Sequence, residues 1–484
     1  MCIRDSLQPA TADGTGEVPW TPVMRMLGDG ITGAGFAQWV VVGAPADLGE
    51  GILAAALAAV VDTHDMLRAR VEQGRLIVGE RGSVDTAGQV RRVGLDGGSL
   101  DEAVEGAVRD AVGLLAPETG EMVQAVWVDA GPGRVGRLVM AVHHLAVDGV
   151  SWRILVPDLR AACEAAAAGR TPALEPVAVP FRRWASLLEE WAASTERVGE
   201  LPVWQAILGQ GDRPICGREL STGSVSSRSW GMSGAEASAL LGRVPSLFFC
   251  GVHEVLLAGL AGAVARWSGD HAVLVDVESH GRHAVGGLDL SRTVGWFTSV
   301  HPVRLDLSGI DLAPGDLLKA VKEQSRAVPD DGLGHGLLRH LNAETRPVLE
   351  AVPSPWIGFN YMGRFATGEQ NDVAEWQQVG DIGGSLDPAM APPHALQVDA
   401  VVRDMPGGPE LTLMVSWPAS LFEEVEIERF GRMWRDVLSG LARLTDDSSA
   451  GGHTASDFDL LDLDQDEIEG FEAIAAHFGG GEKQ

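Results

Sequence analysis

Strand-like and helix-like segments alternate along this chain in two stretches of similar texture, and this alternation predicts an α/β protein. In the first stretch the periodicity predicts strands at residues 36–42 and 137–142 and helices at residues 51–68, 99–115 and 151–168. In the second stretch it predicts helices at residues 252–267, 316–327 and 422–444 and strands at residues 272–278, 356–362, 395–402 and 411–417. Because the late strands follow one another closely, we expect mixed rather than purely parallel sheets.

Local signals mark helix ends and a boundary between the two stretches. Ser99 and Glu102 have the spacing of a capping box, and Gly169 is expected to end the helix before it. The chain has 484 residues, which exceeds one ordinary core of roughly 100–200 residues. We therefore predict a disordered or non-native start at 1–15, a first lobe at 16–175, a second lobe at 176–448 and an acidic tail or linker at 449–484.

The charge balance excludes whole classes of function. Asp and Glu number 67 against 37 Lys and Arg, which gives a net charge of -30. Because nucleic acids and anionic membrane surfaces are bound by clustered cations, we expect neither as a partner. The four cysteines have no CxxC spacing, and no apolar run reaches the roughly 18 residues of a membrane span. The expectation is a cytoplasmic protein with reduced thiols and no metal site; the cysteines are Cys2, Cys163, Cys216 and Cys250.

Paired histidines end one predicted strand and are the sharpest chemical feature. His143 and His144 are followed by Asp148 and Gly149 and then by a helix. Neighbouring strand residues point to opposite faces, so one histidine should face a cavity while the other packs inward. Imidazole titrates near neutral pH and suits proton transfer, whereas a satisfied structural histidine is the alternative.

A second strand end carries an acid, a histidine and an arginine. Glu278, His280 and Arg282 follow one another there, with either a salt-bridged surface loop or a proton-transfer carboxyl as the interpretation. Residues 292–298 and 359–363 are aromatic-rich segments, and the second contains Asn360 and Tyr361, the chain's only tyrosine. Core packing is the alternative for the first segment, and a cross-strand pair is the alternative for the second.

In this order, these segments resemble the condensation superfamily of nonribosomal peptide synthetases and, within it, the epimerization domain. Residues 143–152 fit HHxxxDGxSW, 292–303 fit RTVGWFT…PV, and 278–282, 329–338, 359–363, 64–68 and 20–22 resemble further motifs of the superfamily. The resemblance covers residues 16–460. The chain departs from the family's motifs at Ser279, His283, His335 and Arg364.

The resemblance implies two lobes like chloramphenicol acetyltransferase, arranged as a V-shaped pseudo-dimer with a tunnel along their interface. His144 and Glu278 would converge there, one from each lobe, although they are far apart in sequence. No cofactor of its own is implied, because the substrate is tethered through 4'-phosphopantetheine on a partner carrier domain. The implied partners are an upstream peptidyl carrier domain and a downstream condensation domain.

The implied reaction is inversion of the Cα centre, from L to D, of an aminoacyl or peptidyl thioester. His144 and Glu278 are the expected catalytic pair, with the direction of proton transfer for each left open. The expected supporting residues are His143, Asp148, Gly149, Arg282, Asn360 and Tyr361, with Asp148 pairing with Arg282. Three alternatives stay open: a condensation domain forming an amide between two carrier-bound substrates, a silent carrier-recruiting domain, and a coenzyme A acyltransferase.

Overall fold

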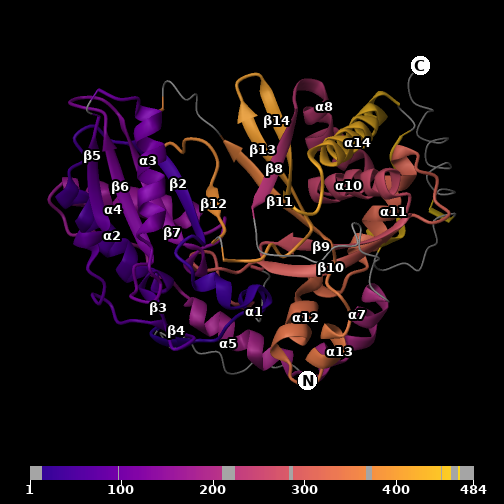
Figure 1. The fold of residues 1–484 in the computed structure, drawn as a ribbon, viewed down its shortest axis with the longest axis horizontal. Coiled ribbons are helices and arrows are strands. Elements are labelled where there is room, and N and C mark those ends of the chain that lie inside the picture. Colours follow the sequence, from indigo (N-terminus) through magenta and orange to yellow (C-terminus); the bar gives the residue numbers. More distant parts are fainter. Residues whose placement is uncertain are drawn as a thin grey trace, which may run out of the picture.

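The structure is a computed structural model that describes residues 14–95, 97–209, 224–282, 287–366, 373–387, 389–447, 450–458 and 467–468. Almost all of the predicted start at 1–15 and most of the predicted tail at 449–484 lie outside these residues. His283, Cys2 and Cys216 also lie outside them. Two sheet-containing lobes make up the described chain (Figure 1), as the alternating pattern predicts.

The N-terminal lobe is built on a five-stranded mixed sheet. Its strand order is β12-β2-β7-β6-β5, and only β5 and β6 run parallel. Helix α3 packs on one face of the sheet against β6 and β7, and helices α2 and α4 form the core with the other face. The bounds are β2 Ala37–Ala44, β5 Val90–Gly94, β6 Val123–Asp129, β7 Gly136–His143, β12 Gly383–Ser385, α2 Glu50–Thr63, α3 Leu100–Gly113 and α4 Trp152–Ala167.

The C-terminal lobe is built on a six-stranded mixed sheet of order β10-β9-β11-β13-β14-β8. Strand β11 runs parallel to β9 and β13, and the other neighbours are antiparallel. Helices α10, α11 and α14 pack together beside this sheet (Figure 1). The bounds are β8 Val225–Met232, β9 Ala272–Ser279, β10 Ser299–Asp306, β11 Ile357–Ala366, β13 Leu396–Met405, β14 Gly408–Pro418, α10 Val252–Ser268, α11 Pro314–Arg326 and α14 Glu424–Arg443.

Smaller elements complete the described chain. A three-stranded sheet of order β1-β4-β3 lies at the N-terminal lobe. The remaining bounds are β1 Gly16–Val18, β3 Ala69–Glu72, β4 Arg75–Val78, α1 Pro22–Leu27, α5 Phe181–Ala192, α6 Thr195–Val198, α7 Leu201–Leu208, α8 Gly234–Ser238, α9 Val244–Phe248, α12 Leu333–Gly336 and α13 Arg346–Glu350.

Segments that follow the predicted boundary at residue 176 pack into the N-terminal lobe. Strand β12 pairs with β2, and Trp184, Trp296 and Phe297 are buried in the same core as the helices of that lobe. The predicted boundary at residue 176 stays a prediction, but segments that follow it contribute to the N-terminal lobe. Residues distant in sequence therefore meet at the interface of the lobes.

Two local predictions are wrong. The predicted helix at 51–68 ends at Thr63, and Asp65–Arg68 form a 3₁₀ turn. The reason is Arg68, whose guanidinium donates to the carbonyls of Val61 and Asp62 and so satisfies the last turn of the helix from outside. Ser99 is the N-cap of α3, yet its side chain makes no capping hydrogen bond.

Among the described helices, none alone has the length and apolar composition to cross a bilayer. A pair at residues 234–248 and 252–268 meets that test only when joined across a 101° bend.

Candidate functional site

The two histidines at the end of β7 have different environments, as the strand alternation predicts. His143 is fully buried; its Nε2 donates to the carbonyl of Gly33 at 3.0 Å, and its Nδ1 accepts from the N–H of Leu145 at 3.4 Å. Burial lowers the pKa of His143 to about 4. His143 is thus a neutral side chain with both ring nitrogens hydrogen-bonded, and these bonds hold the end of β7 in place.

His144 instead lines two cavities and is held by aromatic rings. Its ring stacks on Phe36 with centroids 4.7 Å apart and an interplanar angle of 9°, and it contacts Trp296, also at 4.7 Å. Desolvation lowers the pKa of His144 below its ordinary value, against opposing contributions from the backbone and Asp148. A neutral imidazole, able to accept a proton, therefore faces the cavities at neutral pH.

Gln38 on β2 is a hydrogen-bond partner of Nε2 of this imidazole. The Gln38 amide nitrogen lies 2.9 Å from His144 Nε2, and the Trp152 indole N–H donates to the Gln38 amide oxygen at 3.0 Å. The sequence predictions named Trp152 only as the end of a motif, and they did not include Gln38. Its one sequence signal is a polar residue within an apolar strand.

Asp148 and Arg282 form an ion pair between segments of the two sequence halves, which confirms the predicted pairing. Arg282 donates to both carboxylate oxygens of Asp148 at 3.0 and 3.2 Å, and their side chains are only 10% and 5% exposed. Ser151 and the backbone N–H of Phe297 also donate to Asp148. The Arg282 guanidinium lies 4.0 Å above the Phe297 ring. Asp148 is consequently a structural anchor between the lobes.

Glu278 lies near the end of β9, and the strand alternation explains why it reaches the cavities. Val275 packs in the core and Val277 packs there at the edge of the larger cavity, whereas Asp276 and Glu278 line the smaller cavity. Burial, reinforced by the charge of Asp399 and opposed by His394, raises the pKa of Glu278 to about 7. At neutral pH this carboxyl is close to half protonated and can both give and take a proton.

Glu278 has titratable neighbours that the sequence predictions did not include. Burial raises the pKa of Asp399 to about 6, although Gln397 donates to its carboxyl at 2.9 Å. His394 contacts Asp276 at 3.0 Å. Asp399 is directly opposite Asn360 in the register of β13 and β11. Their sequence signal is weak, because only the sheet order places these strands side by side.

The remaining predicted residues lie around the same space. Asn360 lines both cavities, whereas Tyr361 and Gly149 line only the larger one. Burial raises the pKa of Tyr361, so its hydroxyl stays protonated at neutral pH. Of the departures from the family's motifs, His335 is buried against Trp204, and Arg364 pairs with Asp404 at the surface.

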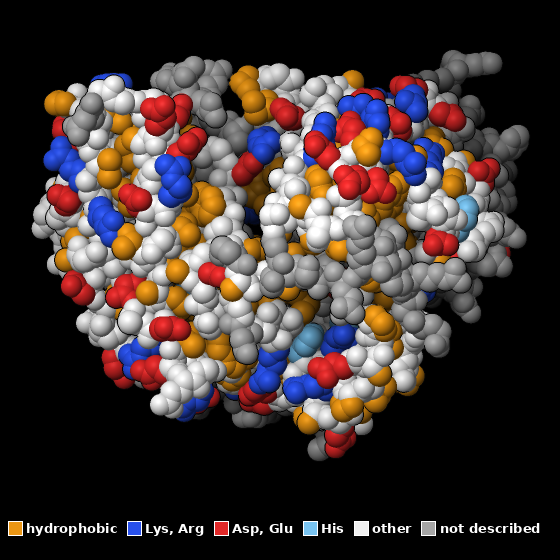
Figure 2. Space-filling model, in the orientation of Figure 1, with side chains coloured by type: hydrophobic (Ala, Val, Ile, Leu, Met, Phe, Trp, Pro, Cys, Tyr) orange, Lys and Arg blue, Asp and Glu red, His pale blue; other side chains and the backbone are white. Residues whose placement is uncertain are grey.

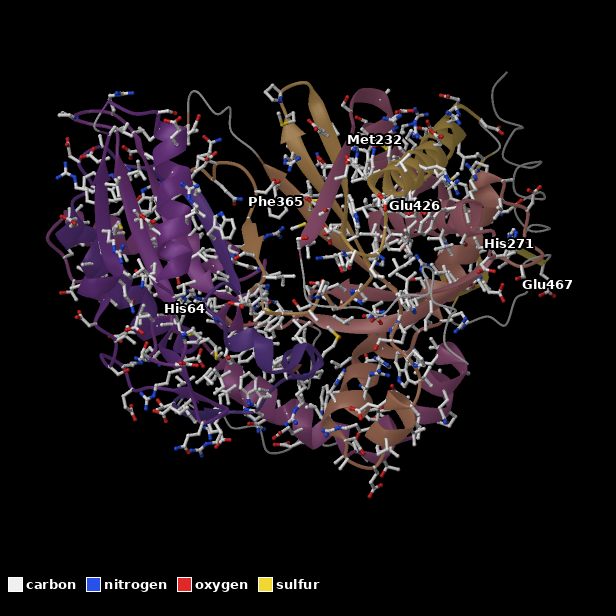
Figure 3. The ribbon with its side chains drawn as sticks, viewed as in Figure 1. His64, Met232, His271, Phe365, Glu426 and Glu467 are labelled. Carbon is white, nitrogen blue, oxygen red and sulfur yellow. The ribbon has the colours of Figure 1, made fainter. Side chains whose placement is uncertain are left out.

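Two cavities of about 740 and 420 Å³ meet between the lobes. Phe365 on β11 lines the larger one, from the side of the C-terminal lobe that faces the N-terminal lobe (Figure 3). The surface is hollowed between the lobes in the view of Figure 2. The residues common to both linings are Gln38, His144, Glu278, Thr298, Asn360 and Gly384.

His144 from the N-terminal lobe and Glu278 from the C-terminal lobe therefore both lie where the cavities join. An imidazole and a carboxyl from different lobes line this junction. This arrangement suits moving a proton at a weakly acidic centre.

Comparisons with known proteins agree with this architecture. The family model described as "Condensation domain" matches residues 32–463. A linear gramicidin synthase of Brevibacillus parabrevis is 32% identical over 473 residues, which cover 94% of this chain and 9% of that protein. Tyrocidine synthase 1 of the same organism is 26% identical over 477 residues, covering 95% of this chain and 44% of that protein. The chain thus spans less than half the length of either relative.

Solved structures share the fold. The epimerization domain from the third module of a tyrocidine synthetase has a TM-score of 0.76 and 25% identity, covering 89% of this chain and 98% of that one. The X-domain from teicoplanin biosynthesis has a TM-score of 0.62 and 18% identity, covering 92% of this chain and 98% of that one, which shows the fold alone.

Proposed function

This chain belongs to the condensation-domain family, and we propose that it inverts the Cα centre of an aminoacyl or peptidyl thioester held on a carrier domain. The observation that carries the proposal is the position of His144 and Glu278, from different lobes, at the junction of two cavities. The likeness to an epimerization domain at 25% identity supports the same reaction.

The chemistry of inversion matches this pair. A thioester carbonyl acidifies the Cα proton by delocalising charge onto its oxygen. Inversion requires that one group removes this proton from one face and another delivers a proton to the opposite face. His144 is neutral, and Glu278 has a pKa of about 7, so one group accepts while the other donates. The backbone N–H groups near Gly149 are the proposed donors to the enolate oxygen.

The fold supplies the route for the substrate under this proposal. Lobes like chloramphenicol acetyltransferase, at 16–175 and 176–448, would form a V with a tunnel along their interface. A 4'-phosphopantetheine arm of an upstream carrier domain would enter through one cavity and place its thioester at the junction. A downstream condensation domain would take the inverted product.

Condensation is the second function that the family supports, because the matching model is described as a condensation domain. Amide formation between two carrier-bound substrates would use His144 and would not require Glu278. The dependence of the reaction on Glu278 therefore separates the two functions.

The test is chirality of the product released from a holo-carrier loaded with an L-aminoacyl or L-peptidyl thioester. We expect D-product from the wild type and a rate loss of about a hundredfold or more in His144→Ala and Glu278→Gln. Glu236→Gln, on the exposed face of α8, is the matched control and should retain the wild-type rate. Retained L-configuration, with amide formation once a loaded acceptor carrier is added, would establish condensation instead.

A further inference from the structure

A chain of two hydrogen bonds connects the buried Trp152 to His144 through Gln38. Trp152 is 3% exposed and begins helix α4, Gln38 lies on β2, and His144 follows β7. The indole nitrogen lies 3.0 Å from the Gln38 amide oxygen, and the Gln38 amide nitrogen lies 2.9 Å from His144 Nε2.

The donor and acceptor inventory fixes the direction of both bonds. An indole N–H can only donate, so the atom of Gln38 that faces Trp152 must be the amide oxygen. The amide NH₂ of Gln38 then faces His144, and an NH₂ group can only donate. His144 Nε2 must accept this hydrogen bond and carries no proton of its own, so the ring proton lies on Nδ1.

We propose that Trp152 and Gln38 act as a positioning relay that holds His144, before substrate binds, as the neutral imidazole protonated at Nδ1. The single lone pair of Nε2 accepts the Gln38 hydrogen bond in this state, so Nε2 takes a proton only when the Gln38 amide moves away from it. Gln38 is a positioning residue, because it acts through His144. His143 is held by its own bonds in the opposite tautomer, with the proton on Nε2. Neighbouring imidazoles with opposite tautomers show that local hydrogen bonds, rather than the strand, select the state of each ring.

Other groups around His144 do not replace the relay. Phe36 and Trp296 contact the ring and fix its plane, but they present no carboxylate. The charged or titratable groups nearby are His143, Glu278, Arg153 and the ion-paired Asp148 and Arg282. A donor on Nε2 stabilises the neutral ring over the imidazolium, because the imidazolium has no lone pair to accept it.

The inference rests on the proposed function only for the use of His144 as a proton acceptor. The tautomer itself is measurable without substrate. The first experiment is therefore a ¹⁵N spectrum of the full chain labelled at histidine, in which His144→Ala identifies the resonances of His144. We expect an unprotonated Nε2 and a protonated Nδ1 at neutral pH. A protonated Nε2 in the wild type would overturn the proposal, whatever reaction the chain performs.

Variants test the relay itself. Gln38→Glu keeps the shape but turns the donor into an acceptor, so the ring should gain a proton on Nε2 and its pKa should rise by about one unit or more. The rising limb of the pH profile of the inversion rate should then move to higher pH by the same amount. Gln205→Glu, exposed on α7, adds the same charge elsewhere and should change neither.

Trp152→Phe removes the indole donor together with part of the buried ring, and it frees the Gln38 amide to rotate, so the His144 resonances should report a mixture of tautomers. An unchanged tautomer in both Gln38→Glu and Trp152→Phe would contradict the relay. If Trp152→Phe fails to fold, the wild-type and Gln38→Glu spectra still decide the question. An inactive wild type with the expected tautomer would contradict the proposed function while leaving the relay intact.

Discussion

At the residue scale, the pKa values of two side chains at the candidate site shift in opposite directions. Burial lowers the pKa of His144 and raises that of Glu278 to about 7, because each charged form loses solvation between the lobes. The sequence predicted both residues from their motifs and strand ends. It did not predict Gln38, since one polar residue in an apolar strand gives no local signal of its partner 106 residues away.

The raised pKa of Glu278 predicts a pH-dependent cost in stability. The pKa in the folded chain, about 7, lies above the ordinary value of 4.5, so folding favours the protonated form. The wild-type chain therefore has its full free energy of unfolding below pH 4.5, where Glu278 is protonated in both states. It loses part of that free energy as pH rises through 7. Glu278→Gln should therefore become more stable than the wild type across this window, by about 3 kcal/mol at most. Denaturant unfolding at several pH values measures the difference, and a pH-independent difference would contradict the shift.

The buried Arg282–Asp148 pair predicts an asymmetric mutational response. Arg282→Met leaves the Asp148 carboxylate buried without its cation and should lower the free energy of unfolding by about 3–5 kcal/mol. Adding Asp148→Asn to Arg282→Met removes the orphaned charge and should recover part of this loss. Denaturant unfolding of the two single variants and the double variant completes the cycle, and strict additivity would argue against a direct ion pair.

At the element scale, the loops after β7 and β9 bring the site together, and strand alternation aims the side chains. Long periodic segments such as α4, α10, α14, β13 and β14 were predictable from local pattern. Strand β12 was not, because Gly383–Ser385 contains no apolar residue and forms only by pairing with β2. Strand β8 was also missed, since it lies at the sheet edge and half of its sequence VSSRSWGM is polar.

Two glycines in these loops should respond differently to the same substitution. Gly281 has φ +62°, and an added Cβ would lie 1.7 Å from the carbonyl oxygen of Phe297. Gly281→Ala should therefore displace the loop after β9 and lower both stability and activity. A Cβ added at Gly149 would have no other atom within 4 Å, so Gly149→Ala should leave the unfolding midpoint unchanged. Thermal unfolding compares them, and equal destabilisation would contradict the described loop geometry.

At the scale of the whole molecule, segments from late in the sequence contribute to the N-terminal lobe. A short C-terminal strap also packs on the second lobe. The strap, residues 450–458, lies on α11, where Asp457 pairs with the fully buried ammonium of Lys322 at 2.5 Å. Asp457 also pairs with Arg326 at 2.8 Å. Composition alone predicted an acidic tail and gave no sign of this contact, because the partner lies 135 residues earlier in the chain.

The strap predicts a large effect from one acidic residue among many. Asp457→Asn removes the charge that compensates Lys322 and should lower the free energy of unfolding by about 3 kcal/mol. Asp404→Asn breaks the exposed pair with Arg364 and should have no measurable effect. Equal unfolding curves for the two variants would show that the strap does not fasten the lobe.

We propose that two groups from different lobes exchange the Cα proton of a carrier-bound thioester. Deuterium incorporation at Cα tests this exchange, measured by mass spectrometry after reaction of the loaded carrier in heavy water. We expect deuterium at Cα in the D-product of the wild type, with this product lost in both His144→Ala and Glu278→Gln. Two results would contradict it. One is an active wild-type chain whose products carry no deuterium at Cα. The other is a Glu278→Gln variant that exchanges the Cα proton as fast as the wild type.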